Sequence, residues 1–225
     1  MNFKQICTDM IRHRDMEQGR GIAKYLRHQY EFMGVPSKVR KRISHEYIKD
    51  DPSPAELDWE YVEACWDQVF REFQYLALDY LLSRQDLLKG NDLFKLRRLI
   101  QDKPGWDICD QMGRLVLHIT RRHPESKRHL LEWARNTDSS VRRVAIIHQL
   151  GAADETDEEL LAEIIETNLP AKEGIIKKAI SRALADYSLS HPQFVDDFIW
   201  QHSDQMSAEL RREAGKHLEK NKSER

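Results

Sequence analysis

The 225-residue sequence contains few of the residues that interrupt or crosslink a chain: nine glycines, seven prolines and three cysteines. The cysteines are odd in number and form no CxxC pair, which argues against a disulfide framework and against a cysteine zinc site. No apolar run is long enough to span a membrane, and the first ten residues lack the basic and then apolar pattern of a signal peptide. We therefore expect a protein of the reducing cytoplasm.

The common catalytic motifs are also missing. The sequence has no glycine-rich phosphate loop, no HExxH, no GxSxG and no zinc-deaminase signature. His118, His123 and His129 lie close together, but no acidic residues stand at ligand spacing from them. We interpret them as surface or core histidines, and we expect no metal and no cofactor.

Helical periodicity runs through almost the whole chain, whereas no convincing alternating strand is present. In residues 55–70, for example, Leu57, Tyr61 and Ala64 fall near one stripe, with Ser53 as a candidate cap and Pro54 at the first helical position. We expect helices in the ranges 19–34, 36–49, 55–70, 71–84, 91–101, 106–122, 124–136, 139–150, 157–169, 173–189, 192–202 and 207–220. The predicted fold class is all-α.

Breakers such as Pro104, Pro124 and Pro170 separate these helices at roughly even intervals. Short helices joined by short turns indicate helix pairs stacked as a HEAT-like solenoid, with a globular bundle as the alternative. We expect one domain over residues 1–220, a frayed polar tail at 221–225, and a monomer.

Charge is unevenly distributed, although the formal net charge is only −2. Residues 154–166 carry seven acids and no lysine or arginine, whereas residues 121–143 carry seven bases. Further basic clusters lie at 38–42, 95–98 and 172–182. Bases that recur on successive repeats would form a concave, basic face that follows a phosphate backbone, and the alternative is ordinary ion pairs between solvated helix faces.

One pair of residues is not explained by ordinary ion pairs between solvated helix faces. Trp106 and Asp110 stand four residues apart, so they project from the same face of the helix expected at 106–122. From spacing alone, Trp106 would pack in the core while Asp110 caps the helix or pairs with Arg114.

Five segments in order resemble the AlkD-like DNA alkylation repair proteins, which are built of HEAT-like repeats. They are AKYLRHQYEFMGV (23–35), VFREFQYLALDYL (69–81), WDICDQMG (106–113), SSVRRVAIIHQL (139–150) and GIIKKAISRALADYSLSHPQFVDDFI (174–199). This resemblance implies an enzyme that cleaves the N-glycosidic bond of purines alkylated at N3 or N7 in duplex DNA. It gives Asp110 the catalytic carboxylate position and Trp106 the neighbouring aromatic position. Asp107 also matches an aspartate, but it lies off that face and is interpreted as structural.

The resemblance also implies DNA contacts. Arg142 and Arg143 match the double arginine of the family, one of which contacts the DNA backbone. Lys178 shares a helix face with Arg182, and two cations on one face indicate an anion opposite them, either a DNA phosphate or the acids of 154–166. We therefore expect DNA-binding roles for Arg142, Arg143, Lys178 and Arg182.

Two positions depart from the family pattern. Gly105 replaces the first tryptophan of a pair, and Ser181-Arg182 replaces Gly-Trp, which removes an aromatic wall of the cleft. The first hypothesis is a metal-free DNA glycosylase for cationic alkylpurines. The alternatives are a non-catalytic protein that binds damaged or branched DNA, and a protein-interaction scaffold that uses its acidic helix.

Overall fold

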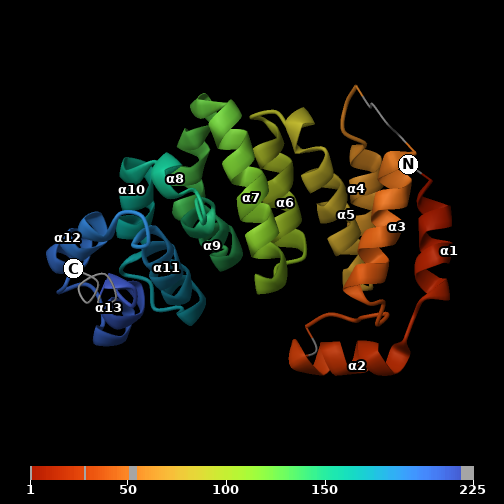
Figure 1. Ribbon diagram of the computed structural model, residues 1–225, viewed down its shortest axis with the longest axis horizontal. Helices are drawn as coiled ribbons and strands as arrows, with labels where there is room; N and C mark the ends of the chain where they lie inside the picture. Colours follow the sequence, from red (N-terminus) through yellow and green to blue (C-terminus); the bar gives the residue numbers. More distant parts are fainter. Residues whose placement is uncertain (1, 28, 51–54, 219–225) are drawn as a thin grey trace. The chain divides into compact units, whose positions relative to one another are not determined.

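The computed structural model describes residues 2–27, 29–50 and 55–218, which are all-helical apart from turns and connections (Figure 1). The predicted all-α class is confirmed. The chain divides into two compact units, Met1–Leu88 and Lys89–Arg225. A single domain over 1–220 and a continuous solenoid with a concave, basic face stay predictions, and the tail at 221–225 lies outside the described residues.

The first unit contains five helices: α1 (Phe3–Arg12), α2 (Met16–Tyr25), α3 (Ser37–Lys49), α4 (Trp59–Trp66) and α5 (Arg71–Ser83). Helix α5 packs against α3 and α4, and α1 packs against α3. Buried side chains such as Val62, Leu76 and Leu81 form the apolar core of this unit.

The helix predicted at 19–34 is wrong in its second half, because α2 ends at Tyr25. A buried carboxylate organises the segment that follows. Glu72 accepts hydrogen bonds from the backbone N–H groups of Met33 and Gly34 at 3.1 and 2.9 Å. Gly34 has a φ of +80°, a left-handed conformation that favours glycine, and a Cβ there would lie 1.8 Å from the carbonyl oxygen of Asp15. This tertiary anchor holds the segment out of the helix that its sequence pattern suggests.

The helix predicted at 55–70 is shorter than expected. Helix α4 begins at Trp59, and the Asp58 side chain caps it by accepting from the N–H of Tyr61 at 2.8 Å. The predicted cap and first residue, Ser53 and Pro54, lie outside the described residues.

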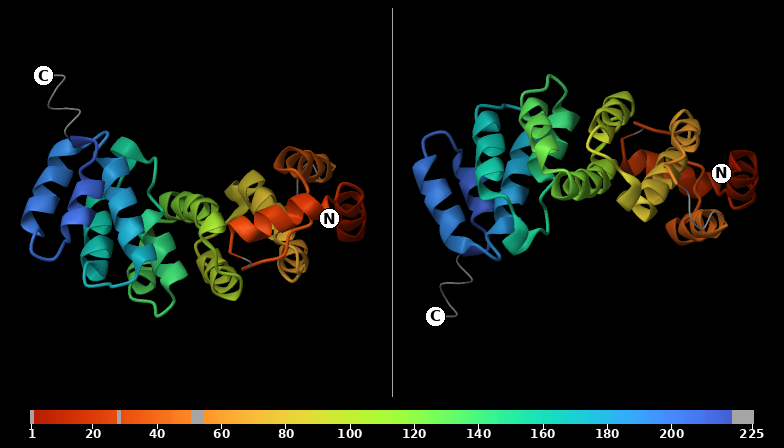
Figure 2. Two further views of the ribbon diagram at one scale, coloured as in Figure 1. Left: turned by 90° about the horizontal axis from the view of Figure 1, so that it is seen from below. Right: turned by 90° about the horizontal axis from the view of Figure 1, so that it is seen from above.

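The second unit contains the helices α6 (Asp92–Asp102), α7 (Trp106–Arg122), α8 (Arg128–Ala134), α9 (Ser139–Ile147), α10 (Glu158–Asn168), α11 (Gly174–Tyr187), α12 (Pro192–Gln201) and α13 (Ala208–Ala214). Helices α7, α9, α11 and α13 are successive neighbours in one layer, and α8 and α10 adjoin in a second layer. Helices α8 to α13 lie packed together in this unit, with α13 beside α11 (Figure 2). Within this unit, α9 thus lies between α7 and α11.

A glycine sets how closely α7 and α9 approach. Gly113 faces the end of α9, where an added Cβ would lie 3.3 Å from the Cα of His148. His148 is fully buried at this contact, and its Nδ1 donates to the carbonyl oxygen of Ala145 at 2.6 Å. The close packing of α7 on α9 brings the outer faces of α7 and α11 within reach of long side chains.

The burial of His148 predicts a pH dependence of stability. Burial lowers its pKa from 6.5 to about 4, so the unfolded chain binds this proton more readily than the folded protein does. The stabilisation is complete above pH 6.5 and is lost as the pH falls toward 4, by about 3 kcal/mol in all. Urea unfolding at a series of pH values should show this loss, and His148→Gln should remove that part of the dependence. An identical pH profile for the variant would contradict it.

No helix in the described ranges is long and apolar enough to cross a membrane. The same residues contain no cluster of three or more side chains suited to hold a metal ion.

Candidate functional site

Helix α7 begins at Trp106 and presents it to solvent. Trp106 is 52% exposed, so the alternative in which it packs in the core is wrong. Gly105 precedes the helix with an extended backbone, at a φ of 173°. Asp110 follows one turn later, and its side chain is 46% exposed. The structure therefore places an accessible indole and an accessible carboxylate on consecutive turns of one helix, as their spacing predicts.

The carboxylate of Asp110 is held by an arginine from α11. Nη1 and Nη2 of Arg182 donate to Oδ1 and Oδ2 of Asp110 at 2.7 and 2.8 Å, which is a bidentate pair across α9. This bond holds the pKa of Arg182 above its usual value. In the described part of the chain, Asp110 does not pair with Arg114, and Arg182 does not pair with the acids of 154–166. Both of those alternatives are wrong, because the stacking of α7 and α11 on α9 brings Asp110 and Arg182 together.

The two arginines of α9 bind partners within the protein. Arg142 forms an ion pair with Glu173. Arg143 is 8% exposed, and its Nη1 donates to the carbonyl oxygen of Ile175 at 3.4 Å. It also lies beside the thiol of Cys109, whose pKa burial raises to about 11 while Arg143 opposes the shift. Arg143 therefore links α9 to both α7 and α11.

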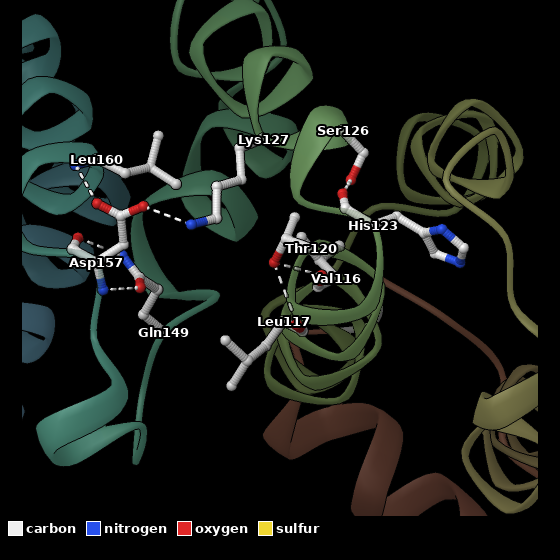
Figure 3. Close-up of polar contacts among 9 residues, drawn as sticks. All are labelled: Val116, Leu117, Thr120, His123, Ser126, Lys127, Gln149, Asp157 and Leu160. Atoms are coloured by element: carbon white, nitrogen blue, oxygen red, sulfur yellow. Dashed lines mark hydrogen bonds and ion pairs between the residues drawn. The ribbon is translucent and has the colours of Figure 1, made fainter.

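The acidic and basic runs found in the sequence face each other in this unit. Three ion pairs join the region from α7 to α8 with the region around α10: Arg121–Glu155 at 2.7 Å, Lys127–Asp157 at 2.7 Å and Arg135–Glu163 at 3.3 Å. Figure 3 shows Lys127 donating to the carboxylate of Asp157. The same carboxylate caps α10 by accepting from the N–H of Leu160, and the backbone N–H of Asp157 donates to the side chain of Gln149. Burial alone would raise the pKa of the Asp157 carboxyl, but the hydrogen bonds from Lys127 and from the backbone N–H of Leu160 hold this pKa below its usual value. These bases pair with acids of neighbouring helices in the DNA-free protein, as the ion-pair alternative predicts.

Other acids of this segment also have internal partners. Glu158 accepts from the hydroxyl of Tyr187, Asp154 lies 3.9 Å from His191, and Glu166 lies 3.3 Å from His202. Most acids of residues 154–166 therefore pair with side chains of their own unit. This argues against the alternative of a protein-interaction scaffold that uses this acidic helix.

The exposed bases nearest in sequence to the Asp110–Arg182 pair lie on its two helices. Arg114 follows Asp110 by one turn on α7, and Lys178 precedes Arg182 by one turn on α11; both are exposed. Of the four residues expected to bind DNA, Lys178 and Arg182 reach the surface, whereas Arg142 and Arg143 are largely covered.

Several contacts in and around the site could not be predicted from the sequence. Glu173 is 31 residues from Arg142, and Gly113 and His148 meet only because α7 packs on α9. Asp186 raises the pKa of Arg182 through its charge, and its spacing of four residues on the same helix was a usable signal.

The fold and this site describe an all-helical protein that presents an indole and a carboxylate side by side on one helix. The sequence model of the DNA alkylation repair enzymes matches residues 6–218, and the chain belongs to this family. It is similar to a solved structure described as a predicted DNA alkylation repair enzyme from Enterococcus faecalis, with 25% sequence identity and a TM-score of 0.83. The similarity covers 92% of this chain and 97% of that one. Comparison with curated proteins finds no match.

Proposed function

We propose that this protein hydrolyses the N-glycosidic bond of cationic N3- or N7-alkylated purines in duplex DNA. The observation that carries the proposal is the accessible carboxylate of Asp110 one turn from the accessible indole of Trp106, in a chain of the DNA alkylation repair family. The sequence indicates no metal or cofactor for this reaction, and the chemistry needs none, because an alkylated purine already carries positive charge and leaves readily.

The proposed roles follow from the charge that develops during bond cleavage. As the bond to the base breaks, cationic character moves to the deoxyribose, as in sugar hydrolysis generally. A fixed carboxylate at Asp110 stabilises that charge and orients a water for attack. The face of the Trp106 indole adds attraction for a cation and shapes the site. The base departs with the bonding electrons, which neutralise its charge, and the water supplies the hydroxyl at C1′ while its remaining proton passes to solvent.

One observation favours a second candidate function, the binding of damaged or branched DNA without catalysis. The guanidinium of Arg182 occupies both oxygens of Asp110, which is where a sugar cation would have to be stabilised. In addition, Arg182 stands where the family usually has an aromatic residue.

Release of free base separates the two candidates. Duplex DNA methylated at purines is incubated with excess protein, and free 3-methyladenine and 7-methylguanine are measured by chromatography. Release above that of DNA alone supports the glycosylase. Binding of the same DNA with no release would establish the second candidate instead.

The lysine on the exposed face of α11 provides a test of DNA binding. If Lys178 contacts a phosphate, Lys178→Ala should weaken binding to any duplex and reduce the log–log dependence of affinity on salt by about one unit. Lys177→Ala is the matched control, since Lys177 is also exposed but lies about 100° away around the helix. Fluorescence anisotropy at several salt concentrations measures both slopes. Equal slopes for the two variants would remove Lys178 from the interface.

The buried arginine should behave differently in the same experiment. Arg143→Ala removes the bond to Ile175 and a buried guanidinium that links three helices, so it should lower the free energy of unfolding by about 1–3 kcal/mol. The log–log dependence of its DNA affinity on salt concentration should stay close to that of the unchanged protein.

A further inference from the structure

We propose that Arg182 is a gating residue, whose guanidinium neutralises Asp110 in the DNA-free protein and transfers to a backbone phosphate when duplex DNA binds. This inference rests on the proposed function, because it concerns regulation of the same carboxylate. It assigns to the departure at position 182 a role that the aromatic residue of the family does not have.

The first step of the argument is what the pair does to the site. A bidentate guanidinium satisfies both oxygens of Asp110 and cancels its charge. A neutralised carboxylate offers little to an oxocarbenium-like sugar. In the DNA-free protein, the carboxylate of Asp110 therefore cannot stabilise a cationic sugar, although both this carboxylate and the indole of Trp106 are accessible to solvent.

The second step is that the pair is easily broken. The side chains of Arg182 and Asp110 are 47% and 46% exposed, so water competes for both charges. Exposed ion pairs contribute about 0–1 kcal/mol to stability, and the bidentate geometry puts this pair toward the upper end of that range. Breaking the pair therefore costs little, provided that the guanidinium gains another anion.

The third step is that duplex DNA supplies that anion. Phosphates accept bidentate hydrogen bonds from arginine as carboxylates do, and they stand at regular intervals along the duplex. Lys178 is exposed one turn away on the same face of α11, so it would hold a phosphate near Arg182. The positive charge added by Lys178 and Arg114 next to the pair also favours the arrival of a polyanion.

Binding to an undamaged duplex tests the exchange without any chemistry. Affinity is measured for the unchanged protein, Asp110→Asn, Arg182→Ala and the double variant, with Asp107→Asn as a control for the loss of one negative charge on α7. Since Asp110 competes with phosphate for Arg182, Asp110→Asn should tighten binding about fivefold, the factor that corresponds to about 1 kcal/mol. The same substitution in the Arg182→Ala background should give no more than the control.

The outcomes separate this inference from the proposed function. Absence of salt-sensitive duplex binding by the unchanged protein would overturn both. Binding with an equal effect of Asp110→Asn in the two backgrounds, or an effect equal to that of Asp107→Asn, would overturn the gate and leave the glycosylase proposal standing. Coupling between Asp110 and Arg182 with no release of methylated base would support the gate and overturn the catalytic proposal.

A thermal melt of each variant checks for a merely structural role. A static surface pair would change the melting temperature in the cycle but would leave DNA affinity additive. The exchange also involves the pair in the DNA-free protein, so it predicts the same effect on melting and differs in predicting coupling in affinity.

Discussion

Asp110→Asn should lower the single-turnover rate of base release from methylated DNA about 10²- to 10³-fold while the protein remains folded. The substitution keeps the shape of the side chain but removes the negative charge proposed to face the cationic sugar, and electrostatic contributions of this kind are worth about 3–4 kcal/mol. Duplex binding should be retained or strengthened, because the competitor for Arg182 is also removed. The measurement is release of labelled base at saturating protein.

Asp107→Asn is the matched control for that experiment. It makes the same chemical change three residues earlier on α7, at a position about 100° around the helix from Trp106. We expect a rate close to that of the unchanged protein. Unaltered release by a folded Asp110→Asn protein would end the assignment of Asp110 as the catalytic carboxylate.

Arg182→Trp should raise the rate of alkylpurine release, or create release if the unchanged protein has none. The gain comes from an aromatic face toward a cationic sugar, because the guanidinium that neutralises Asp110 in the DNA-free protein has already moved to a phosphate when duplex DNA is bound. Position 182 is exposed, so a larger side chain fits without disturbing the core. The expected gain is at least tenfold in the single-turnover rate, which corresponds to about 1.4 kcal/mol of transition-state stabilisation.

Arg182→Ala separates the loss of the guanidinium from the gain of an aromatic face. It removes the guanidinium without adding an aromatic face, so at saturating protein, where Arg182 has already moved to a phosphate, its rate should stay close to that of the unchanged protein. Both variants should bind duplex DNA more weakly, because both lose a phosphate contact. If a folded Arg182→Trp protein shows no gain at saturation, the residue at 182 is not what limits catalysis.

The helices could be predicted from sequence because their causes are local. The apolar stripe of α7 and its acidic first turn lie within residues 106–122, and the predicted range agrees with the observed helix. Asp138 and Asp157 cap α9 and α10 through bonds to residues two or three positions away. Where prediction failed, the cause was distant, as with Glu72, which holds the segment before α3 through groups 38 and 39 residues away.

In the candidate site, too, local features could be predicted from the sequence, whereas contacts between distant residues could not. The sequence by itself determined that Trp106 and Asp110 share a helix face, because four residues make about one turn, and its ordered motifs led to the DNA alkylation repair family. Only the tertiary structure decided which charges meet, since Arg121, Lys127 and Arg135 pair with acids 28 to 34 positions away in sequence. It also joined Asp110 to Arg182 across 72 residues. A charged side chain has no preference for a particular partner until helix packing fixes the distance between them, which is why the neutralised carboxylate could not be inferred from the sequence.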